Sequence, residues 1–397
     1  MGCIFCPKRG LTHIELVIEP VMLTFILAPA NKFGFAISVK SSRSFSTSHR
    51  IVELDVHDVA FGGAGVGRLE GKVVFVPLTI DGERVQAKLI ERRSGYDRAQ
   101  LTKVLLPSTH RVGPVCPYFG RCGGCDYQHI AYDHQLELKR RQVIQLLERI
   151  GRITDVQVSP TSPCGRPYAF RNRITVHAME GRIGFFEKNS RNVVDVEHCP
   201  IAVPAVNEEL KELREKGLRD GQHRTLRGLD VPRTFTQTNE FIASALVDYV
   251  ARQVTGDILV DAYCGSGFFG HALAHRFRIV IGLDRNEPAI AAAKLTANPN
   301  EEYICDDVSA AIASVLEEYE PQTIILDPPA DGLKGSVTKA LLTKPSNRLI
   351  YVSCNPATLA RDLSRLASRY RIIEIQPFDM FPQTAEIEVV AVLEARP

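Results

Sequence analysis

From about residue 236 to the C-terminus, short apolar runs alternate with helical patterns, and this alternation constrains the fold more than any other feature. The runs ILVDAYC, IVIGLD, TIILDPP and RLIYVSC are separated by helix-like stretches, and EIEVVAVLEA forms a last strand pattern. Such alternation predicts an α/β domain with a parallel sheet and helices on both faces. In this class, ligands and reactive groups gather at the carboxyl ends of the strands.

Residues 50–108 show short alternating β patterns separated by glycine turns, which predict a small closed barrel of the oligonucleotide-binding (OB) type. The second half of this region is rich in basic residues: Arg84, Lys88, Arg92, Arg93, Arg98 and Lys103. Because the whole chain carries a formal charge of only +2, any attraction to RNA has to come from such a local stripe. We therefore predict that the barrel contacts RNA; a plain solvated face is the alternative.

Residues 109–235 hold three clustered cysteines, Cys116, Cys122 and Cys125, followed by a helical pattern that Gly151 is expected to cap. The close spacing of the cysteines favours a metal or cluster site in a reducing compartment over disulfides. Two β-like runs follow, and the polar, basic stretch KGLRDGQHRTLRGLDVPR reads as a linker. These features predict a small α+β central domain.

Residues 1–49 show neither a domain pattern nor a clear targeting signal, and we predict an extension that is disordered or mis-annotated. The stretch SSRSFSTSHR is typical of organelle transit peptides, whereas Glu15 and Glu19 break their acid-poor rule. We therefore predict a cytoplasmic protein, with the mitochondrion as the alternative if this segment is a transit peptide. No apolar run reaches the roughly 18 residues that a membrane helix needs, so no membrane partner is expected.

The stretch DAYCGSGFFG places a Gly-x-Gly turn between a strand and a helix. Gly265 and Gly267 would let the backbone approach a ligand, and the next strand ends in Asp284, whose carboxylate can bind ribose hydroxyls. The loop lacks the full G-x-G-x-x-G dinucleotide pattern, so it favours an adenosyl ligand without a pyrophosphate. These features predict S-adenosylmethionine as a methyl donor.

Cys354 ends another strand pattern, in LIYVSCNP, where Asn-Pro forces a turn; a buried structural thiol is the ordinary alternative. At the edge of a sheet, a thiolate could add to carbon 6 of a uracil and make carbon 5 nucleophilic. A nearby carboxylate would then remove the proton from carbon 5. Ala330, which follows Asp-Pro-Pro, offers no aromatic ring to stack on a target base, and this favours a carbon over a nitrogen as the methylated atom.

SCNPATLARDL and FPQTAEIE resemble the signature motifs of the RNA uracil-5-methyltransferases. In that family the cysteine of the first motif is the nucleophile and the final glutamate of the second is the base, which implies catalytic Cys354 and Glu388. The resemblance covers residues 50–397. It implies a Rossmann-like class I methyltransferase domain at 236–397, with the N-terminal barrel as an RNA-binding TRAM domain. Glu386 stands where the family often has His.

The same resemblance implies a set of cofactor-binding residues and several departures. The S-adenosylmethionine contacts fall, besides Gly265, Gly267 and Asp284, on Gln237, Tyr263, Asp306 and Asp327. The departures are Phe268 in place of a usual Asn, Ala330 in place of a common Arg, and Gln383 in place of His. The segment between Cys199 and Gln237 is also short for the family.

CPYFGRCGGC and the later EHCP resemble the family's iron–sulfur site. The resemblance implies a [4Fe–4S] cluster held by Cys116, Cys122, Cys125 and Cys199. Zinc is the alternative for four cysteines. Zinc sites usually show two close pairs, whereas here three ligands cluster and one is remote.

Taken together, the motifs predict a monomeric enzyme that methylates carbon 5 of a uridine in structured RNA, ribosomal RNA first and tRNA second. A radical S-adenosylmethionine enzyme would need a Cys-x₃-Cys-x₂-Cys pattern, and a cytosine-5 methyltransferase a second cysteine in a Pro-Cys motif; the chain has neither at these motifs. A third rival is a non-catalytic RNA-binding protein. That rival has to explain why Cys354 and Glu388 are both present.

Overall fold

The computed structural model describes residues 15–18, 21–24, 50–227 and 239–397. The chain divides into two compact units, Met1–Ser46 and Thr47–Pro397. In the first unit, β1 (Glu15–Ile18) and β2 (Val21–Thr24) form an antiparallel hairpin. The other residues of the proposed N-terminal extension lie outside the described residues. So does the Ser/Arg-rich stretch SSRSFSTSHR, except for its last residue, Arg50.

The first domain of the second unit is a closed barrel, as the pattern of short strands and glycine turns predicts. Its strands are β3 (Ile51–Val59), β4 (Ala64–Leu69), β5 (Lys72–Pro77), β6 (Glu83–Arg92) and β7 (Tyr96–Leu106), in the order β3-β4-β5-β7-β6. Alternate side chains point inward, so that residues such as Val52, Val74 and Val85 form an apolar interior. This packing requires Gly67, because a Cβ there would lie 2.1 Å from Leu54 Cδ1.

The central part of the chain combines a small antiparallel sheet with a covering helix. The sheet has the order β10 (Val193–Asp195), β9 (Arg182–Phe186), β8 (Ile174–Met179), β11 (His223–Leu226). Helix α2 (Pro204–Lys216) buries Val206 and Leu210 in the same core as the inward side chains of β8. The prediction that KGLRDGQHRTLRGLDVPR is a linker is therefore partly wrong. Its residues His223–Leu226 form the edge strand β11, in which only Leu226 is buried.

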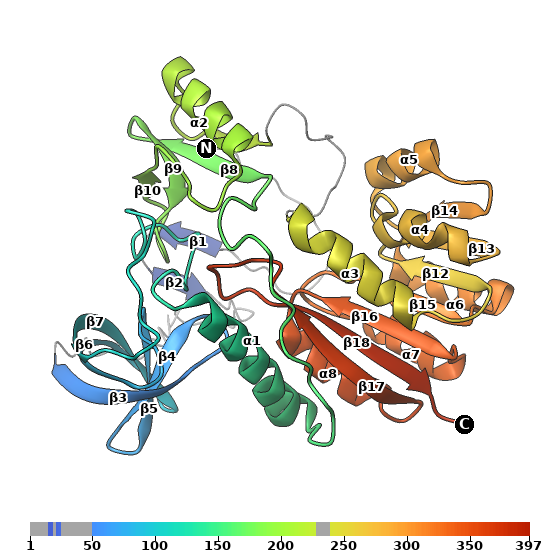
Figure 1. Ribbon diagram of the computed structural model, residues 1–397, viewed down its shortest axis with the longest axis horizontal. Coiled ribbons are helices and arrows are strands. Elements are labelled where there is room, and N and C mark those ends of the chain that lie inside the picture. Colours follow the sequence, from blue (N-terminus) through green and yellow to red (C-terminus); the bar gives the residue numbers. More distant parts are fainter. Residues whose placement is uncertain (1–14, 19–20, 25–49, 228–238) are drawn as a thin grey trace, which may run out of the picture. The chain divides into compact units, whose positions relative to one another are not determined.

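Helix α1 (Tyr132–Leu146) lies between the barrel and the C-terminal domain (Figure 1). Its Gln145 Nε2 donates a hydrogen bond to Asp58 Oδ2 of the barrel at 2.7 Å, while Val143 packs into the core of the C-terminal domain. One helix thus contacts both neighbouring domains.

Helix α1 continues as a π-helical turn, η1 (Leu147–Gly151). Gly151 is not the cap expected from sequence; the C-cap is Arg152, in the left-handed conformation with φ 56°. Gly151 instead allows a close approach, because a Cβ on it would lie 2.8 Å from the carbonyl oxygen of Ala360.

Residues 239–397 form the predicted α/β domain. Its sheet has the order β14-β13-β12-β15-β16-β18-β17, made of β12 (Ile258–Ala262), β13 (Ile279–Asp284), β14 (Glu301–Cys305), β15 (Thr323–Leu326), β16 (Arg348–Ser353), β17 (Tyr370–Phe378) and β18 (Glu388–Ala395). Neighbours from β14 to β16 are parallel, whereas β18 runs antiparallel to both β16 and β17. The last strand of the chain is therefore inserted inside the sheet.

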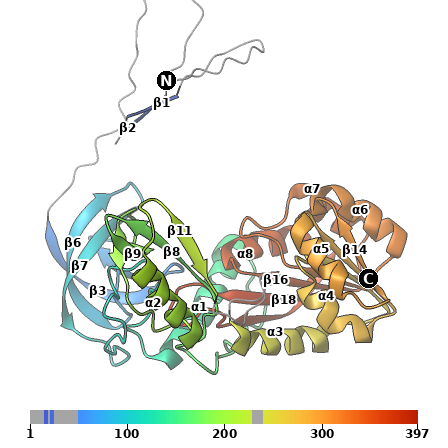
Figure 2. The ribbon, with the colours of Figure 1, turned by 90° about the horizontal axis from the view of Figure 1, so that it is seen from above.

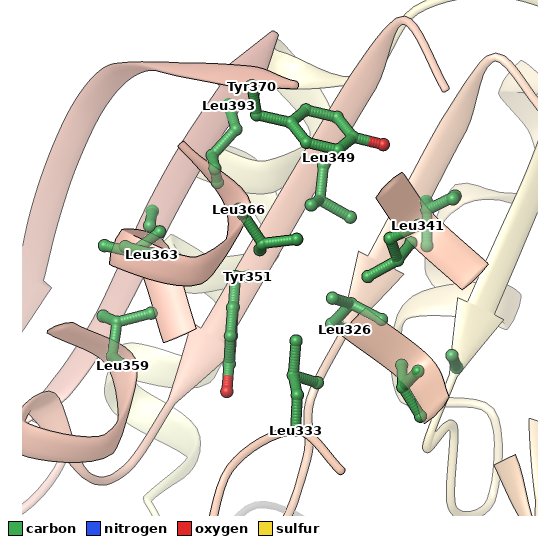
Figure 3. Packing of buried hydrophobic residues seen from close by; sticks show 14 of the residues in the cluster. Leu326, Leu333, Leu341, Leu349, Tyr351, Leu359, Leu363, Leu366, Tyr370 and Leu393 are labelled. Carbon is green, nitrogen blue, oxygen red and sulfur yellow. The ribbon is translucent and has the colours of Figure 1, made fainter. Parts of the chain in front are cut away.

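Helices cover both faces of this sheet, as Figure 2 shows for α3 and α7. The helices are α3 (Glu240–Gln253), α4 (Phe268–Leu273) with the 3₁₀ turn η2 (Ala274–Arg276), α5 (Glu287–Thr296), α6 (Val308–Tyr319), α7 (Gly335–Thr343) and α8 (Pro356–Leu366). Side chains of α6, α7 and α8 share one apolar cluster with α1 and the strands; Figure 3 shows part of it, around Tyr351 and Leu363. Side chains of α3 and α4 share the other. In the described part of the chain, no helix has the length and apolar character to cross a membrane.

Candidate active site

The Gly-x-Gly loop turns sharply between β12 and α4. Tyr263, Gly265 and Gly267 all have positive φ, of 65°, 55° and 85°. A Cβ on Gly267 would lie 2.5 Å from the Tyr303 hydroxyl, so glycine is required there. The amide of Gly265 donates to Asp284 Oδ2 at 2.9 Å, which ties the loop to the end of β13. This hydrogen bond joins the two features from which an adenosyl site was predicted.

The other predicted cofactor-binding residues follow neighbouring strands of the same sheet. Asp306 follows β14, and its amide donates to the carbonyl of Asp284 at 3.0 Å. Asp327 follows β15, and its amide donates to the carbonyl of Ala262 at 3.2 Å. Because these strands are parallel, all of these residues lie at one carboxyl edge. Gln237 lies outside the described residues.

Asp261 is a buried carboxylate at this edge that the motif analysis did not single out. Its Oδ2 accepts a hydrogen bond from the amide of Gly270 at 2.9 Å. Burial, together with the charges of Asp327 and Asp284, raises its pKa to about 8. The pKa of Asp327 rises to about 7, through burial and the neighbouring Asp284. Burial and the neighbouring carboxylates thus make these two carboxyl groups harder to ionise than ordinary aspartates.

Cys354 lies directly after β16, at the turn that the sequence predicts. Asn355 caps α8, because its side chain accepts hydrogen bonds from the amides of Ala357 and Thr358 at 3.1 and 3.4 Å. The cysteine side chain is exposed rather than part of the core. Partial burial of the thiol and the negative charges of Glu388 and Asp327 raise its pKa to about 11.

The strand register brings Cys354 and Glu388 together. In the antiparallel pair of β16 and β18, Ser353 is opposite Val389. The next residue of each strand towards this end is Cys354 on one side and Glu388 on the other. Glu388 is buried, and burial followed by the charges of Asp327 and Glu386 raises its pKa well above the ordinary value. A thiol and a carboxyl group that are 34 positions apart in the chain (388 minus 354) thus meet at one edge.

The three departures from the family motifs have structural roles in place of the expected ones. The Phe268 ring packs edge-on against Phe269 at the start of α4, with 4.8 Å between the ring centroids. The carbonyl of Ala330 accepts hydrogen bonds from Asn355 Nδ2 at 3.1 Å and Thr358 Oγ1 at 3.0 Å. This backbone contact ties the Asp-Pro-Pro-Ala loop to the cysteine turn. Gln383 is buried, with φ 67°.

The four predicted cluster ligands line one cavity of about 480 Å³ in the central domain: Cys116, Cys122, Cys125 and Cys199. Arg171, Arg173 and Arg227 line it too. Burial raises the pKa of each thiol, to about 12 for Cys125 and about 11 for Cys199. Among the described residues, no three His, Cys, Asp or Glu side chains converge in the geometry of a metal-ion site. The cysteines are thus brought together in one cavity, without the close convergence of a single-ion site.

The basic stripe of the barrel is less cationic than its sequence suggests. Arg84 pairs with Asp55 at 3.2 Å, and Arg92 with Asp97 at 3.5 Å. Arg93 and Arg98 both pair with Glu91. Acidic neighbours therefore balance much of the positive charge in this part of the barrel.

A doubly wound sheet with a Gly-x-Gly loop, an acidic edge and an antiparallel last strand defines a class I S-adenosylmethionine-dependent methyltransferase. The family description "tRNA (Uracil-5-)-methyltransferase" matches residues 216–314 and 310–396, and "TRAM domain" matches residues 46–102. The chain belongs to the RNA uracil-5-methyltransferase family, and its barrel is a TRAM domain. These matches confirm the predicted fold, family and enzyme class.

Relatives of this chain cover most of it. An uncharacterized RNA methyltransferase of Halalkalibacterium halodurans is 30% identical, over 87% of this chain and 97% of its own length. One from Listeria monocytogenes is 31% identical, over 86% of this chain and 97% of its own. Among solved structures, the Pyrococcus abyssi tRNA (uracil-54, C5)-methyltransferase in complex with S-adenosyl-L-homocysteine is similar to this chain. It has a TM-score of 0.66 and 28% identity, covering 86% of this chain and 100% of that one.

Proposed function

We propose that this enzyme methylates carbon 5 of a uridine in structured RNA through a covalent adduct between Cys354 and the base. The observation that carries the proposal is the antiparallel register of β16 and β18, which sets Cys354 beside Glu388. A sulfur nucleophile and a buried carboxyl group at one sheet edge are the two groups that this reaction demands of the protein.

In the proposed reaction, Cys354 loses its proton to solvent as its sulfur bonds to carbon 6 of the uracil. The Gly265–Gly267 loop and Asp284 would hold S-adenosylmethionine, which would supply the methyl group to carbon 5 and leave as S-adenosylhomocysteine. Glu388 then takes the proton from carbon 5, the bond between sulfur and carbon 6 breaks, and the cysteine is restored. Glu388 has to be ionised for this step, and its raised pKa makes it a stronger base than an ordinary glutamate.

The target uridine has to leave its stack to reach Cys354, at a cost of roughly a few kcal/mol that RNA contacts elsewhere offset. The TRAM barrel supports this role, since single modules of the OB type bind RNA. We favour ribosomal RNA as the substrate, with the barrel and central domain reading the folded shape of the RNA. A tRNA is the second candidate, because the similar Pyrococcus abyssi protein is a tRNA (uracil-54, C5)-methyltransferase.

A nucleoside mass profile of ribosomal RNA and tRNA, from cells with and without the gene, tests the reaction and the substrate together. Loss of 5-methyluridine from the ribosomal pool supports the favoured substrate, and loss from the tRNA pool the second. An unchanged profile in both pools, together with no methylation of either RNA by the purified protein, would overturn the proposal.

The four-cysteine cavity fits a [4Fe–4S] cluster in its donor set and charge. Four thiolates are the usual ligands of such a cluster, and its several irons hold the thiolates farther apart than one metal ion does. Arg171, Arg173 and Arg227 line the same cavity, and cationic side chains can offset the negative charge of thiolates. Because the thiols have raised pKa values, loading the site would release protons. Iron and sulfide content per chain after anaerobic purification tests the assignment.

A further inference from the structure

Helix α1 buries a row of polar side chains that the reaction does not use. Gln135, Lys139 and Gln142 are exposed by 1%, 0% and 1%, at spacings of four and three residues on one helix face. A lysine is almost never fully buried unless it is paired. The partners of this row therefore indicate what the helix does.

Two of the three side chains hold the loop that leads to Glu388. Lys139 Nζ lies 2.5 Å from Asp379 Oδ1 and donates to the carbonyl of Phe381 at 3.0 Å. Gln135 and Gln383 form two hydrogen bonds. Gln135 Nε2 donates to Gln383 Oε1 at 3.0 Å, and Gln135 Oε1 accepts from the backbone N–H of Gln383 at 3.1 Å.

The segment that follows Cys125 holds the same loop from another side. The carbonyl of Gln383 accepts hydrogen bonds from the amides of Asp126 and Tyr127, at 3.0 and 2.9 Å. Gln383 has positive φ, so its backbone is fixed in a conformation that non-glycine residues rarely adopt. These contacts surround the turn between β17 and β18 and bind it to residues 126–139.

We propose that Lys139 and Gln135 are positioning residues that hold the 379–387 loop so that Glu388 meets carbon 5 of the methylated uracil. The proposal rests on the uracil-5 methylation proposed above. Cys354 follows a different strand, and α8 with its Asn355 cap fixes that turn. Loosening the α1 contacts therefore slows proton removal and release of the product while leaving the attack by Cys354 and methyl transfer largely intact.

Two sets of variants test this in different ways. Lys139→Met combined with Asp379→Leu replaces the buried ion pair by apolar groups, a change that proteins often tolerate. Gln135→Met removes the contacts to Gln383 and leaves the ion pair. Gln145→Met is the matched control, because this glutamine lies on the same helix but donates to Asp58 of the barrel.

The measurement is a single turnover with methyl-labelled S-adenosylmethionine and substrate RNA, in which labelled covalent adduct and released product are separated on a denaturing gel. We expect both test variants to transfer the methyl group within about threefold of the wild-type rate and to release product at least tenfold more slowly, so that adduct accumulates. Hydrogen exchange of residues 381–387 should rise in both, and the control should match the wild type.

An equal slowing of both steps, or no slowing of release despite faster hydrogen exchange in the loop, would overturn the positioning role. If the wild-type protein forms no 5-methyluridine at all, the proposed function fails instead, so the two failures are distinguishable. Circular dichroism identifies a variant that has not folded, and the Gln135→Met variant then still decides the question.

Discussion

The carboxyl edge of the C-terminal sheet and the four-cysteine cavity of the central domain differ in the charged side chains that line them. The edge collects carboxyl groups: Asp261, Asp284, Asp327, Glu386 and Glu388. The cavity collects Arg171, Arg173 and Arg227. An acidic edge suits a cationic methyl donor and an uncharged base, and it repels phosphate. We infer that the RNA backbone is held away from the edge, so that the target base alone enters it.

Of the substitutions that test this comparison, removing the proposed nucleophile is expected to have the largest effect, on the rate of methylation. Cys354→Ala leaves the acidic edge intact but abolishes adduct formation, so methylation falls by roughly 10⁴-fold or more. Binding of S-adenosylmethionine, measured by calorimetry, should stay within a few-fold of wild type. Turnover retained in this variant would contradict a covalent route through Cys354; Cys305→Ala, another exposed cysteine, is the control.

Removing the base is expected to slow one step only. Glu388→Gln keeps the size of the side chain but cannot take the proton from carbon 5, so release slows by roughly 10²- to 10⁴-fold and a covalent protein–RNA adduct accumulates. The adduct is measured on a denaturing gel. Its absence, with methylation unimpaired, would assign the base elsewhere; Glu394→Gln, on the same strand, is the control.

Loss of one thiol from the four-cysteine cavity is expected to change the iron content of the protein, which no substitution at the acidic edge should do. Cys199→Ala removes one of the four ligands of the proposed cluster, so iron should fall from about four per chain to near zero if the cluster is present. Iron content is measured by colorimetry on anaerobically purified protein. Cys164→Ala, a buried cysteine outside the set, should retain full iron; equal loss in both would show that stability alone is measured.

The raised pKa of Asp261 predicts a pH-dependent cost to folding at the acidic edge. Its folded-state pKa is about 8 against an ordinary 3.8, so the folded state binds the proton more tightly and stability falls as pH rises from about 4 to about 8. Asp261→Asn removes this cost and should raise Tm by a few degrees, about 2–4 °C at pH 8, with a smaller gain at pH 5. Exposed Asp257→Asn is the control in thermal melts, and a gain independent of pH would contradict the assignment.

The smallest effect is expected from substitutions in the barrel, and it concerns RNA affinity. Lys103→Ala should weaken RNA binding a few-fold and reduce the slope of log affinity against log salt by about 1. Arg84→Ala should change the slope less, because Arg84 already pairs with Asp55 at 3.2 Å. Filter binding across a salt series measures both. Equal slopes for the two variants would mean that ion pairing does not decide which basic residues meet RNA.

The parallel part of the sheet could be predicted from sequence because its strands are apolar on both faces. The runs that became β12, β15 and β16 are largely buried, and fully buried strands read as continuous apolar runs. The edge strand β11 could not be found in this way, since three of its four residues are exposed. Its pairing with β8 depends on tertiary contacts that no local pattern records.

Cys354 and Glu388 could be proposed as nucleophile and base from their motifs, but their proximity could not be derived from the spacing of the motifs. It depends on β18 entering the sheet between β16 and β17, which is a property of topology. Asp261 was missed because it lies inside a strand pattern and looks like one polar residue among apolar ones. Lys139 was missed because a helical lysine ordinarily points to solvent, and its partner Asp379 is 240 positions away.

The placement of the last strand also determines when the protein can become active during its synthesis. Because β18 lies between β16 and β17, the sheet stays open until residues up to Ala395 have left the ribosome. The barrel and the central domain precede it in the chain and are available to fold earlier, since domains fold as units from the N-terminus during translation. A nascent chain can therefore meet RNA before Glu388, the proposed base, is in place, and on the proposed mechanism it cannot then complete a turnover.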